Sequence, residues 1–215
     1  MTQKTPPNLT VYVVTDLQLS KGRSHEEVAA RALEGGATVI QLRDKQASTR
    51  ELCEVGRRIK ALTDKRGALF IVNDRVDIAL AIDADGVHLG QDDLPAAIAR
   101  RLLGSRKVLG VSTENGEQAR QAARDGATYV AIGPIYEARG SKADAGAPIG
   151  VEAIAELRKH TRLPIVAIGG INHDRIAEVA RAGADGAAVI SAIVGADDIT
   201  AATREMKRLF LEAKA

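Results

Sequence analysis

The stretch PIVAIGGI, residues 164–171, contains the pattern on which the whole chain is built: a short apolar strand that ends in a turn of two glycines. Apolar residues then recur every three to four positions over Asp174–Ala182, which is typical of an amphipathic helix. A second apolar strand follows at Ala187–Ile190 and ends in Ser191. A strand, a helix and a strand in this order predict parallel pairing with a right-handed crossover.

The same alternation continues over the rest of the 215 residues. Predicted strands lie at Leu9–Thr15, Thr38–Leu42, Leu69–Val72, Gly86–His88, Lys107–Val111, Tyr129–Ile132, Ile165–Ile168 and Ala187–Ile190. Helical spacing covers Ser24–Glu34, Thr49–Lys65, Val76–Ala81, Pro95–Leu103, Asn115–Arg124, Val151–His160, Asp174–Ala182 and Ile199–Ala213. This alternation predicts a single (β/α)8 TIM barrel, with residues 1–215 as one domain. A doubly wound open sheet is the alternative, but eight strands in a chain of this length close more economically than they stack.

Composition narrows the class of protein. The apolar share is 45% and the aromatic share only 2%, so small and branched aliphatic residues must fill the core. A net charge of +2 without a basic stripe argues against nucleic-acid binding. Cys53 is the only cysteine, which excludes an intramolecular disulfide and fits a reducing compartment. No apolar run approaches the ~20 residues of a membrane span, and Met1–Leu9 lacks a signal-peptide core. We therefore expect a cytoplasmic protein without a membrane partner, and a homo-oligomer is compatible with the sequence.

The second predicted strand ends in polar residues, at the position where barrel enzymes carry their chemistry. Gln41, Arg43 and Lys45 share one face of an extended chain, while Asp44 lies on the other. If that face is the barrel interior, two cations there need an anionic partner, and a diphosphate supplies one. The alternative is a solvated run of charges.

Carboxylates follow the next two predicted strands. Asn73 and Asp74 come after the third strand, and Asp92 and Asp93 come after the fourth. Two carboxylates together with water and phosphate oxygens are a usual Mg²⁺ environment, so we expect a Mg²⁺–diphosphate site here. The alternative is that Asp74 and Asp92 or Asp93 cap helices. His88 is interpreted as a structural residue of its strand.

The later strands end in small and hydroxyl residues. Ser112 is placed either to hydrogen-bond a ligand or to cap a helix. A loop of about fifteen residues after the sixth strand, which contains Lys142, is long for a barrel and suits a lid, although a disordered surface loop is the alternative. Gly169 and Gly170 after strand seven, with Ser191 after strand eight, predict the phosphate site common in this fold.

Several of these pieces also carry a family resemblance. They are Gln41-Leu42-Arg43-Asp44-Lys45, Asn73-Asp74, GVHLGQDD at Gly86–Asp93, Val111-Ser112, Gly133-Pro134-Ile135-Tyr136, Lys142, AIGGI at Ala167–Ile171, and Ile190-Ser191. In this order, across residues 11–193, they resemble the thiamine-phosphate synthase family. The resemblance implies a transferase with two small phosphorylated substrates: a hydroxymethylpyrimidine diphosphate loses pyrophosphate, and the nitrogen of a thiazole phosphate bonds to the pyrimidine methylene.

The resemblance also implies roles for individual residues. Those matching the pyrimidine-diphosphate site are Gln41, Leu42, Arg43, Asp44, Lys45, Asn73, Ser112 and Lys142, of which Arg43, Lys45, Ser112 and Lys142 are the catalytic group. Those matching the thiazole-phosphate site are Arg139, Gly140, Ser141, Gly170, Ile190 and Ser191, and Asp74 and Asp93 match the Mg²⁺ ligands. One departure concerns the lid, because the family usually carries two threonines there, one of them just before its lysine. Here residues 138–142 read ARGSK, which retains a single hydroxyl in Ser141.

Two rival functions stay open at this point. A thiazole tautomerase, an isomerase on the same scaffold, resembles the second half of the chain equally well but needs no Mg²⁺–diphosphate site. A non-catalytic phosphate-binding barrel would need neither the two acidic positions nor Lys142. The synthase reaction requires no nucleophile or strong base, which agrees with a sequence that offers no Ser–His or Cys–His arrangement.

Overall fold

A closed parallel barrel forms the centre of the computed structural model, which describes residues 6–137 and 146–215. Its strands are β1 (Val11–Val14), β2 (Val39–Leu42), β3 (Leu69–Asn73), β4 (Gly86–Leu89), β5 (Val108–Thr113), β6 (Tyr129–Ile132), β7 (Ile165–Ile168) and β8 (Gly186–Val189). Each strand pairs in parallel with the next, and β8 pairs with β1 to close the barrel. The (β/α)8 prediction is confirmed, and so are all eight predicted strands to within a few residues.

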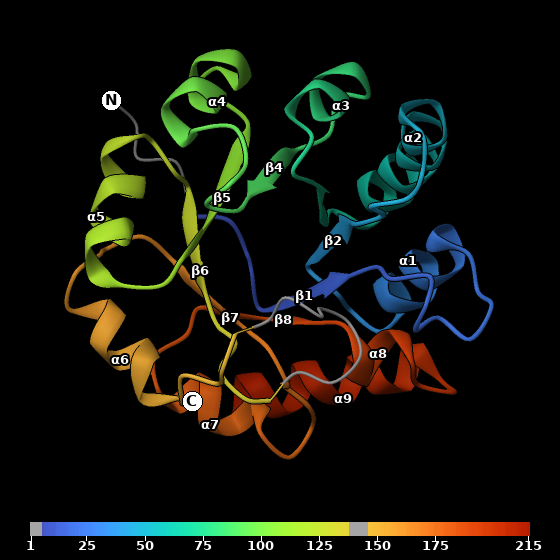
Figure 1. Cartoon of the computed structure of the whole chain (residues 1–215). Helices are drawn as coiled ribbons and strands as arrows, with labels where there is room; N and C mark the ends of the chain where they lie inside the picture. Colours follow the sequence, from blue (N-terminus) through green and yellow to red (C-terminus); the bar gives the residue numbers. More distant parts are fainter. Residues whose placement is uncertain (1–5, 138–145) are drawn as a thin grey trace.

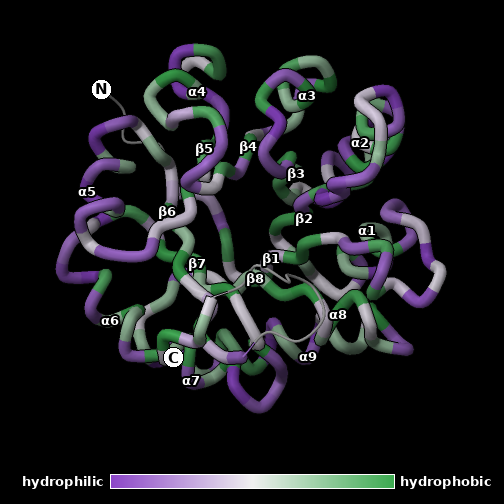
Figure 2. The backbone as a smooth tube through the Cα atoms, in the orientation of Figure 1, coloured by the Kyte–Doolittle hydropathy of each residue, from purple (hydrophilic) through white to green (hydrophobic). Residues whose placement is uncertain are grey.

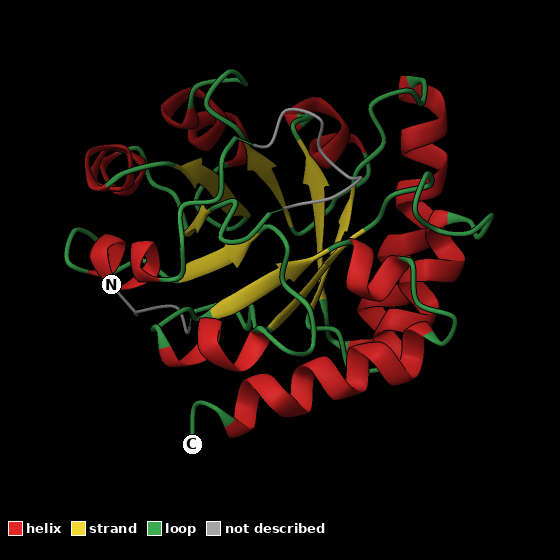
Figure 3. Cartoon of the chain, turned by 60° about the horizontal axis from the view of Figure 1, so that its bottom comes forward, coloured by secondary structure: helices red, strands yellow, loops and turns green. Residues whose placement is uncertain are grey.

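Helices form a ring around the strands (Figures 1 and 3). They are α1 (His25–Glu34), α2 (Thr49–Arg66), α3 (Val76–Ala81), α4 (Ala96–Leu103), α5 (Gly116–Arg124), α6 (Glu152–Arg158), α7 (Ile176–Arg181), α8 (Ser191–Val194) and α9 (Ile199–Glu212). The eight predicted helices are all present, and α8 is an additional short helix directly after β8. Over the described residues, no helix combines the length and apolar character that crossing a membrane requires.

Local sequence signals set where helices end and strands resume. Ser48 closes a capping box with Glu51 at the start of α2, and Gly67 ends that helix in the left-handed conformation. Gly36, Gly126 and Gly183 each have positive φ on the way from a helix into β2, β6 or β8. These short returns keep each strand beside the previous one, so that the carboxyl ends of all strands meet at one mouth of the barrel.

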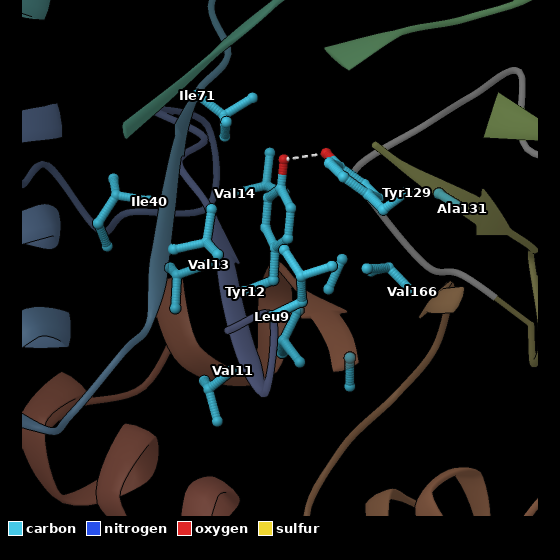
Figure 4. Close-up of a cluster of buried hydrophobic side chains, with 14 of the residues drawn as sticks. Leu9, Val11, Tyr12, Val13, Val14, Ile40, Ile71, Tyr129, Ala131 and Val166 are labelled. Atoms are coloured by element: carbon cyan, nitrogen blue, oxygen red, sulfur yellow. Dashed lines mark hydrogen bonds between the residues drawn. The ribbon is translucent and has the colours of Figure 1, made fainter. Parts of the chain in front are cut away.

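The core lies inside the barrel and between the strands and their helices. In Figure 2 the strands are mostly apolar, whereas the helices alternate between apolar and polar stretches. Small and branched residues fill most of this space, as the composition requires. Two tyrosines are exceptions: Tyr12 on β1 and Tyr129 on β6 are fully buried and meet across the barrel interior (Figure 4).

Candidate active site

Two connected cavities occupy the mouth of the barrel at the carboxyl ends of the strands. The outer cavity has a volume of about 440 Å³ and is lined from the ends of β4 to β8. The inner cavity, about 40 Å³, lies among interior residues of the barrel that include Tyr12, Val14 and Val166. Both cavities share the following lining residues: Ser112, Ala131, Ile168, Ala188 and Ile190. The inner cavity is therefore the floor of one continuous site.

The end of β2 supplies an amide and a cation to the inner cavity. Gln41 is buried and Arg43 is half-buried, and both line this cavity, as the alternation along the strand predicted. Arg43 also forms an ion pair with Asp16, 3.4 Å from Nη1 to Oδ2. Asp16 is held in turn by the backbone amides of the loop that follows β1. Lys45 is exposed beyond the end of the strand, so the structure brings only Arg43 of the two cations into the cavity lining.

The side chains of Leu42 and Asp44, both expected at the pyrimidine diphosphate, lie elsewhere. Leu42 is fully buried in the hydrophobic core because it alternates with Gln41. Asp44 accepts hydrogen bonds from the amides of Gln46 and Ala47 and contacts the buried His25 at 3.3 Å. Burial would raise the pKa of Asp44, but these contacts outweigh it and hold the pKa below its usual value. Asp44 therefore shapes the loop after β2.

The acidic residues after β3 and β4 are not helix caps. Asp74 has a φ of 61°, and α3 begins after Arg75 without a side-chain cap. The Asp93 carboxylate accepts the amide hydrogen of Gly90 at 2.7 Å, while α4 begins after Pro95. The capping alternative is thus wrong for all three acidic residues. Asn73, the last residue of β3, lines the inner cavity, and Asp92 lines the outer one.

Asp74 and Asp93, which follow β3 and β4, carry the carboxylate type of ligand that Mg²⁺ prefers. Asn73 pairs with His88 in the β3–β4 register, and the Asp74 amide donates to the His88 carbonyl at 2.9 Å, so the acidic residues follow hydrogen-bonded strands. Among residues 6–137 and 146–215, no three His, Cys, Asp or Glu side chains gather into a metal site. Mg²⁺ sites commonly combine one or two carboxylates with waters and substrate phosphate oxygens.

The end of β5 corrects one interpretation of the sequence. Ser112 lies inside β5, and Asn115 caps α5, so Ser112 is not a helix cap. Its hydroxyl lies 3.0 Å from Nε2 of His88, on the neighbouring strand β4. The chain therefore does contain a Ser–His contact, contrary to the expectation from sequence. Residues 24 positions apart give no local signal of it, and parallel strand pairing brings them together.

Sequence reasoning also missed the two tyrosines beneath this contact. His88 Nδ1 lies 2.9 Å from the Tyr129 hydroxyl, which lies 2.8 Å from the Tyr12 hydroxyl. Gln41 donates through Nε2 to the Tyr12 hydroxyl at 2.7 Å. Burial raises the pKa of both tyrosines, so both hydroxyls remain protonated. The available signal was a tyrosine inside each of two otherwise aliphatic strands.

A turn of two glycines after β7 lines the outer cavity. Gly169 and Gly170 have φ values of 102° and 61°, which favour glycine. A Cβ on Gly169 would lie 2.5 Å from the Cα of Pro134, so the turn packs directly on the segment after β6. Gly170, Ile190 and Ser191, the predicted thiazole-phosphate residues that lie within the described ranges, all line the cavity. The helix α8 begins at Ser191.

A cluster behind this turn holds it in place. The Tyr136 amide donates to the Gly169 carbonyl at 3.1 Å, and the Tyr136 hydroxyl donates to Glu178 at 2.6 Å. The Arg175 guanidinium lies over the Tyr136 ring, with Cζ 4.7 Å from its centroid, and donates to the Gly170 carbonyl at 2.9 Å. Burial and then the Glu178 carboxylate raise the pKa of Tyr136. The remaining predicted residues, Arg139, Gly140, Ser141 and Lys142, lie outside the described residues.

The fold and the site together define a (β/α)8-barrel enzyme with its polar groups at the carboxyl ends of the strands. Comparison with known proteins gives the family. The family model described as thiamine monophosphate synthase matches residues 11–193. A thiamine-phosphate synthase of Chloroflexus aurantiacus is 57% identical over 199 residues, covering 93% of this chain and 91% of the relative. One of Moorella thermoacetica is 53% identical, covering 97% of this chain and 99% of the relative.

A solved structure agrees with these relatives. The thiamine phosphate pyrophosphorylase from Pyrococcus furiosus superposes with a TM-score of 0.89 at 42% identity, covering 97% of this chain and 98% of that one. The chain belongs to the thiamine monophosphate synthase family. The family resemblance and the prediction of a transferase are thereby confirmed.

Proposed function

We propose that this protein joins a 4-amino-2-methylpyrimidine diphosphate to a hydroxyethylthiazole phosphate, with release of pyrophosphate and formation of thiamine phosphate. The observation that carries the proposal is the pairing of two different polar surfaces in one continuous site. Arg43 and Gln41 line the inner cavity, the Gly169–Gly170 turn and Ser191 line the outer one, and Ser112 lines both. Two phosphorylated substrates need two such surfaces, with their reacting ends held next to each other.

The proposed reaction makes modest demands on the protein. The bond between the pyrimidine methylene carbon and the diphosphate oxygen breaks, and its electron pair leaves with pyrophosphate. The amino group of the pyrimidine donates electron density to the methylene carbon, and the thiazole nitrogen then forms the new carbon–nitrogen bond. Positioning and charge stabilisation supply the catalysis, so no covalent intermediate with a protein nucleophile is needed.

The side chains divide into groups by role. Arg43 is proposed to stabilise the negative charge of the leaving pyrophosphate, with Lys45 and Lys142 as further cations. Asp16 keeps the Arg43 guanidinium oriented.

Mg²⁺, when bound through Asp74 and Asp93, would neutralise charge on the same leaving group. Asn73 and Ser112 complete the pyrimidine side, and Leu42 and Asp44 act by packing and by shaping the loop.

The late strand ends are proposed to bind the monophosphate of the thiazole. The turn at Gly169 and Gly170 lets backbone amides approach an anion, and Ile190 and Ser191, which follow the neighbouring strand β8, line the same cavity. Arg139, Gly140 and Ser141 stay predicted thiazole-phosphate contacts. A phosphate-binding surface alone would suit an isomerase as well, and the additional surface with Arg43 and Gln41 favours the synthase over it.

The proposal is tested by incubating the purified protein with both substrates, with and without Mg²⁺, and detecting thiamine phosphate by mass. Product is expected only when both substrates and Mg²⁺ are present. The absence of product under saturating substrates and Mg²⁺ overturns the proposal. Function of the whole chain as one catalytic domain and a cytoplasmic location stay predictions, and the sequence is compatible with a homo-oligomer.

A further inference from the structure

A chain of hydrogen bonds crosses the floor of the site and links five strands of the barrel. It runs from Gln41 on β2 through Tyr12 on β1, Tyr129 on β6 and His88 on β4 to Ser112 on β5. Its four donor–acceptor distances are 2.7, 2.8, 2.9 and 3.0 Å. Figure 4 shows the central step, in which the Tyr12 and Tyr129 hydroxyls meet between the strands. Both ends of the chain, Gln41 and Ser112, line the inner cavity.

The direction of donation along this chain follows from counting protons. Gln41 donates to the Tyr12 hydroxyl. This hydroxyl has one proton of its own to donate, and its other hydrogen-bond partner among the described residues is the Tyr129 hydroxyl. Tyr129 accepts from Tyr12 and donates its own proton to Nδ1 of His88. A neutral histidine that accepts at Nδ1 carries its proton on Nε2, so His88 donates to the Ser112 hydroxyl.

This direction sets what each end presents to a ligand. Because the Ser112 oxygen accepts from His88, its own proton is available to donate into the cavity. Because Gln41 uses an Nε2 proton within the chain, its Oε1 is the group fixed as an acceptor. It also explains why the Ser–His contact is not a nucleophile–base pair, since Nε2 already carries a proton and cannot take that of Ser112.

Turning the Gln41 amide over would reverse every step. Tyr12 would then donate to Gln41, and Tyr129 would donate to Tyr12. His88 would carry its proton on Nδ1, and Ser112 would donate to His88. The two ends would present the opposite pattern to the cavity, with the amide N–H₂ group and a serine lone pair facing the ligand. The tautomer of His88 therefore reports the polarity of the whole chain.

We propose that Tyr12, Tyr129 and His88 are positioning residues that fix this polarity, so that the site selects an aminopyrimidine over the corresponding pyrimidinone. The inference rests on the proposed function. An aminopyrimidine offers an amino donor to the Gln41 oxygen and a ring-nitrogen acceptor to the Ser112 hydroxyl. In the pyrimidinone, a carbonyl oxygen replaces the amino group and faces the Gln41 oxygen, so two acceptors meet without a proton between them. A site built around such a hydrogen bond is expected to discriminate by about 100-fold or more.

The first test is the tautomer of His88 in the ligand-free wild-type protein. Ring-¹⁵N-labelled histidine distinguishes a protonated from an unprotonated ring nitrogen by NMR, and the four histidines give a small set of signals. The signals missing from a His88→Gln variant identify His88. The expected result is a proton on Nε2. A proton on Nδ1 overturns the proposal.

The second test removes a link without changing the residues at the ends. Tyr129→Phe takes away the donor to His88, and Tyr12→Phe takes away the acceptor for Gln41. Both variants keep the ring volume, and either can serve if the other fails to fold. In each, discrimination between the aminopyrimidine and pyrimidinone diphosphates, measured as a ratio of kcat/KM, is expected to fall about tenfold or more, while KM for the thiazole phosphate stays unchanged.

A matched control is Thr203→Val, which removes an equally buried hydroxyl on α9 that bonds within its own helix. It is expected to leave discrimination intact. Unchanged discrimination in both tyrosine variants overturns the proposal, and so does an equal loss in the control. Failure of the proposed function is distinguishable, because it appears as absent turnover in the wild-type protein, whereas the His88 tautomer is read without any substrate.

Discussion

The ends of β2–β5 and the ends of β6–β8 offer different atoms to the site. The early strands present side chains, with Gln41, Arg43 and Ser112 lining the inner cavity. The late strands include the turn of Gly169 and Gly170, two residues that have no side chains and can offer only backbone groups. The early half is therefore expected to respond to changes in charge and hydrogen bonding, and the late half to any added volume.

The largest effect is expected from adding a methyl group to the late half. In Gly170→Ala, the new Cβ would lie 2.6 Å from the Glu137 carbonyl oxygen, at a residue with a φ of 61°. A displacement of the turn of about 1 Å is expected to lower kcat/KM for the thiazole phosphate about 100-fold. Steady-state kinetics with the thiazole phosphate as the varied substrate measure this.

Gly67→Ala is the control that separates the effect of the steric clash at Gly170 from the effect of backbone strain. Gly67 has a φ of 63°, but its Cβ would meet no atom within 4 Å. This variant should lose about 1 kcal/mol in the free energy of unfolding and keep its activity. Similar losses of kcat/KM in both variants would show that the clash with the neighbours of Gly170 is not the cause of the loss.

The next largest effect is expected from changing the shape of the cation in the early half. Arg43→Lys keeps the charge but loses the planar group that contacts Asp16. We expect kcat/KM for the pyrimidine diphosphate to fall about 10- to 100-fold, with little change in KM for the thiazole phosphate. Arg50→Lys, at an exposed arginine on α2, is the control. Equal effects on the two substrates would contradict a division of the site into two halves.

A smaller effect is expected at the proposed Mg²⁺ ligands. Asp93→Ala should raise the Mg²⁺ concentration that gives half-maximal activity about tenfold. Loss of the hydrogen bond to the Gly90 amide should cost about 1 kcal/mol in the free energy of unfolding. Mg²⁺ titrations of activity and denaturant unfolding measure the two effects separately. Asp92→Ala is the comparison, since Asp92 lines the outer cavity, and an equal Mg²⁺ effect there would add Asp92 to the metal ligands.

The smallest effect is expected behind the glycine turn. Tyr136→Phe removes the hydroxyl that donates to Glu178 but keeps the ring under Arg175. Because Arg175 still holds the Gly170 carbonyl, KM for the thiazole phosphate should rise only about threefold. A larger change in KM for the pyrimidine diphosphate would mean that this cluster serves the early half instead.

Sequence alone predicted the barrel because its signals are local. Strand alternation, helical spacing and glycine returns are all contained within about 20 residues, and strand ends in a parallel barrel share one mouth. The same logic placed Gln41 and Arg43 at the inner cavity and Gly170 and Ser191 at the outer one.

The contacts that sequence missed are long-range. Tyr12 and Tyr129 are 117 positions apart, and Arg43 meets Asp16 across 27 positions. No periodicity links such pairs, because they meet only when the barrel closes. The capping interpretation of Asp74 failed for a related reason: the backbone turns there with positive φ, which the residue types did not reveal.

The central claim is that the two halves of the mouth hold two ligands at once. Its most direct test is calorimetric titration of the wild-type protein with thiazole phosphate, in the absence and in the presence of saturating Mg²⁺ and pyrophosphate. Separate sites predict that the thiazole phosphate still binds when pyrophosphate is bound. An apparent Kd that rises in proportion to the pyrophosphate concentration would show that both anions compete for one site, and would contradict the claim.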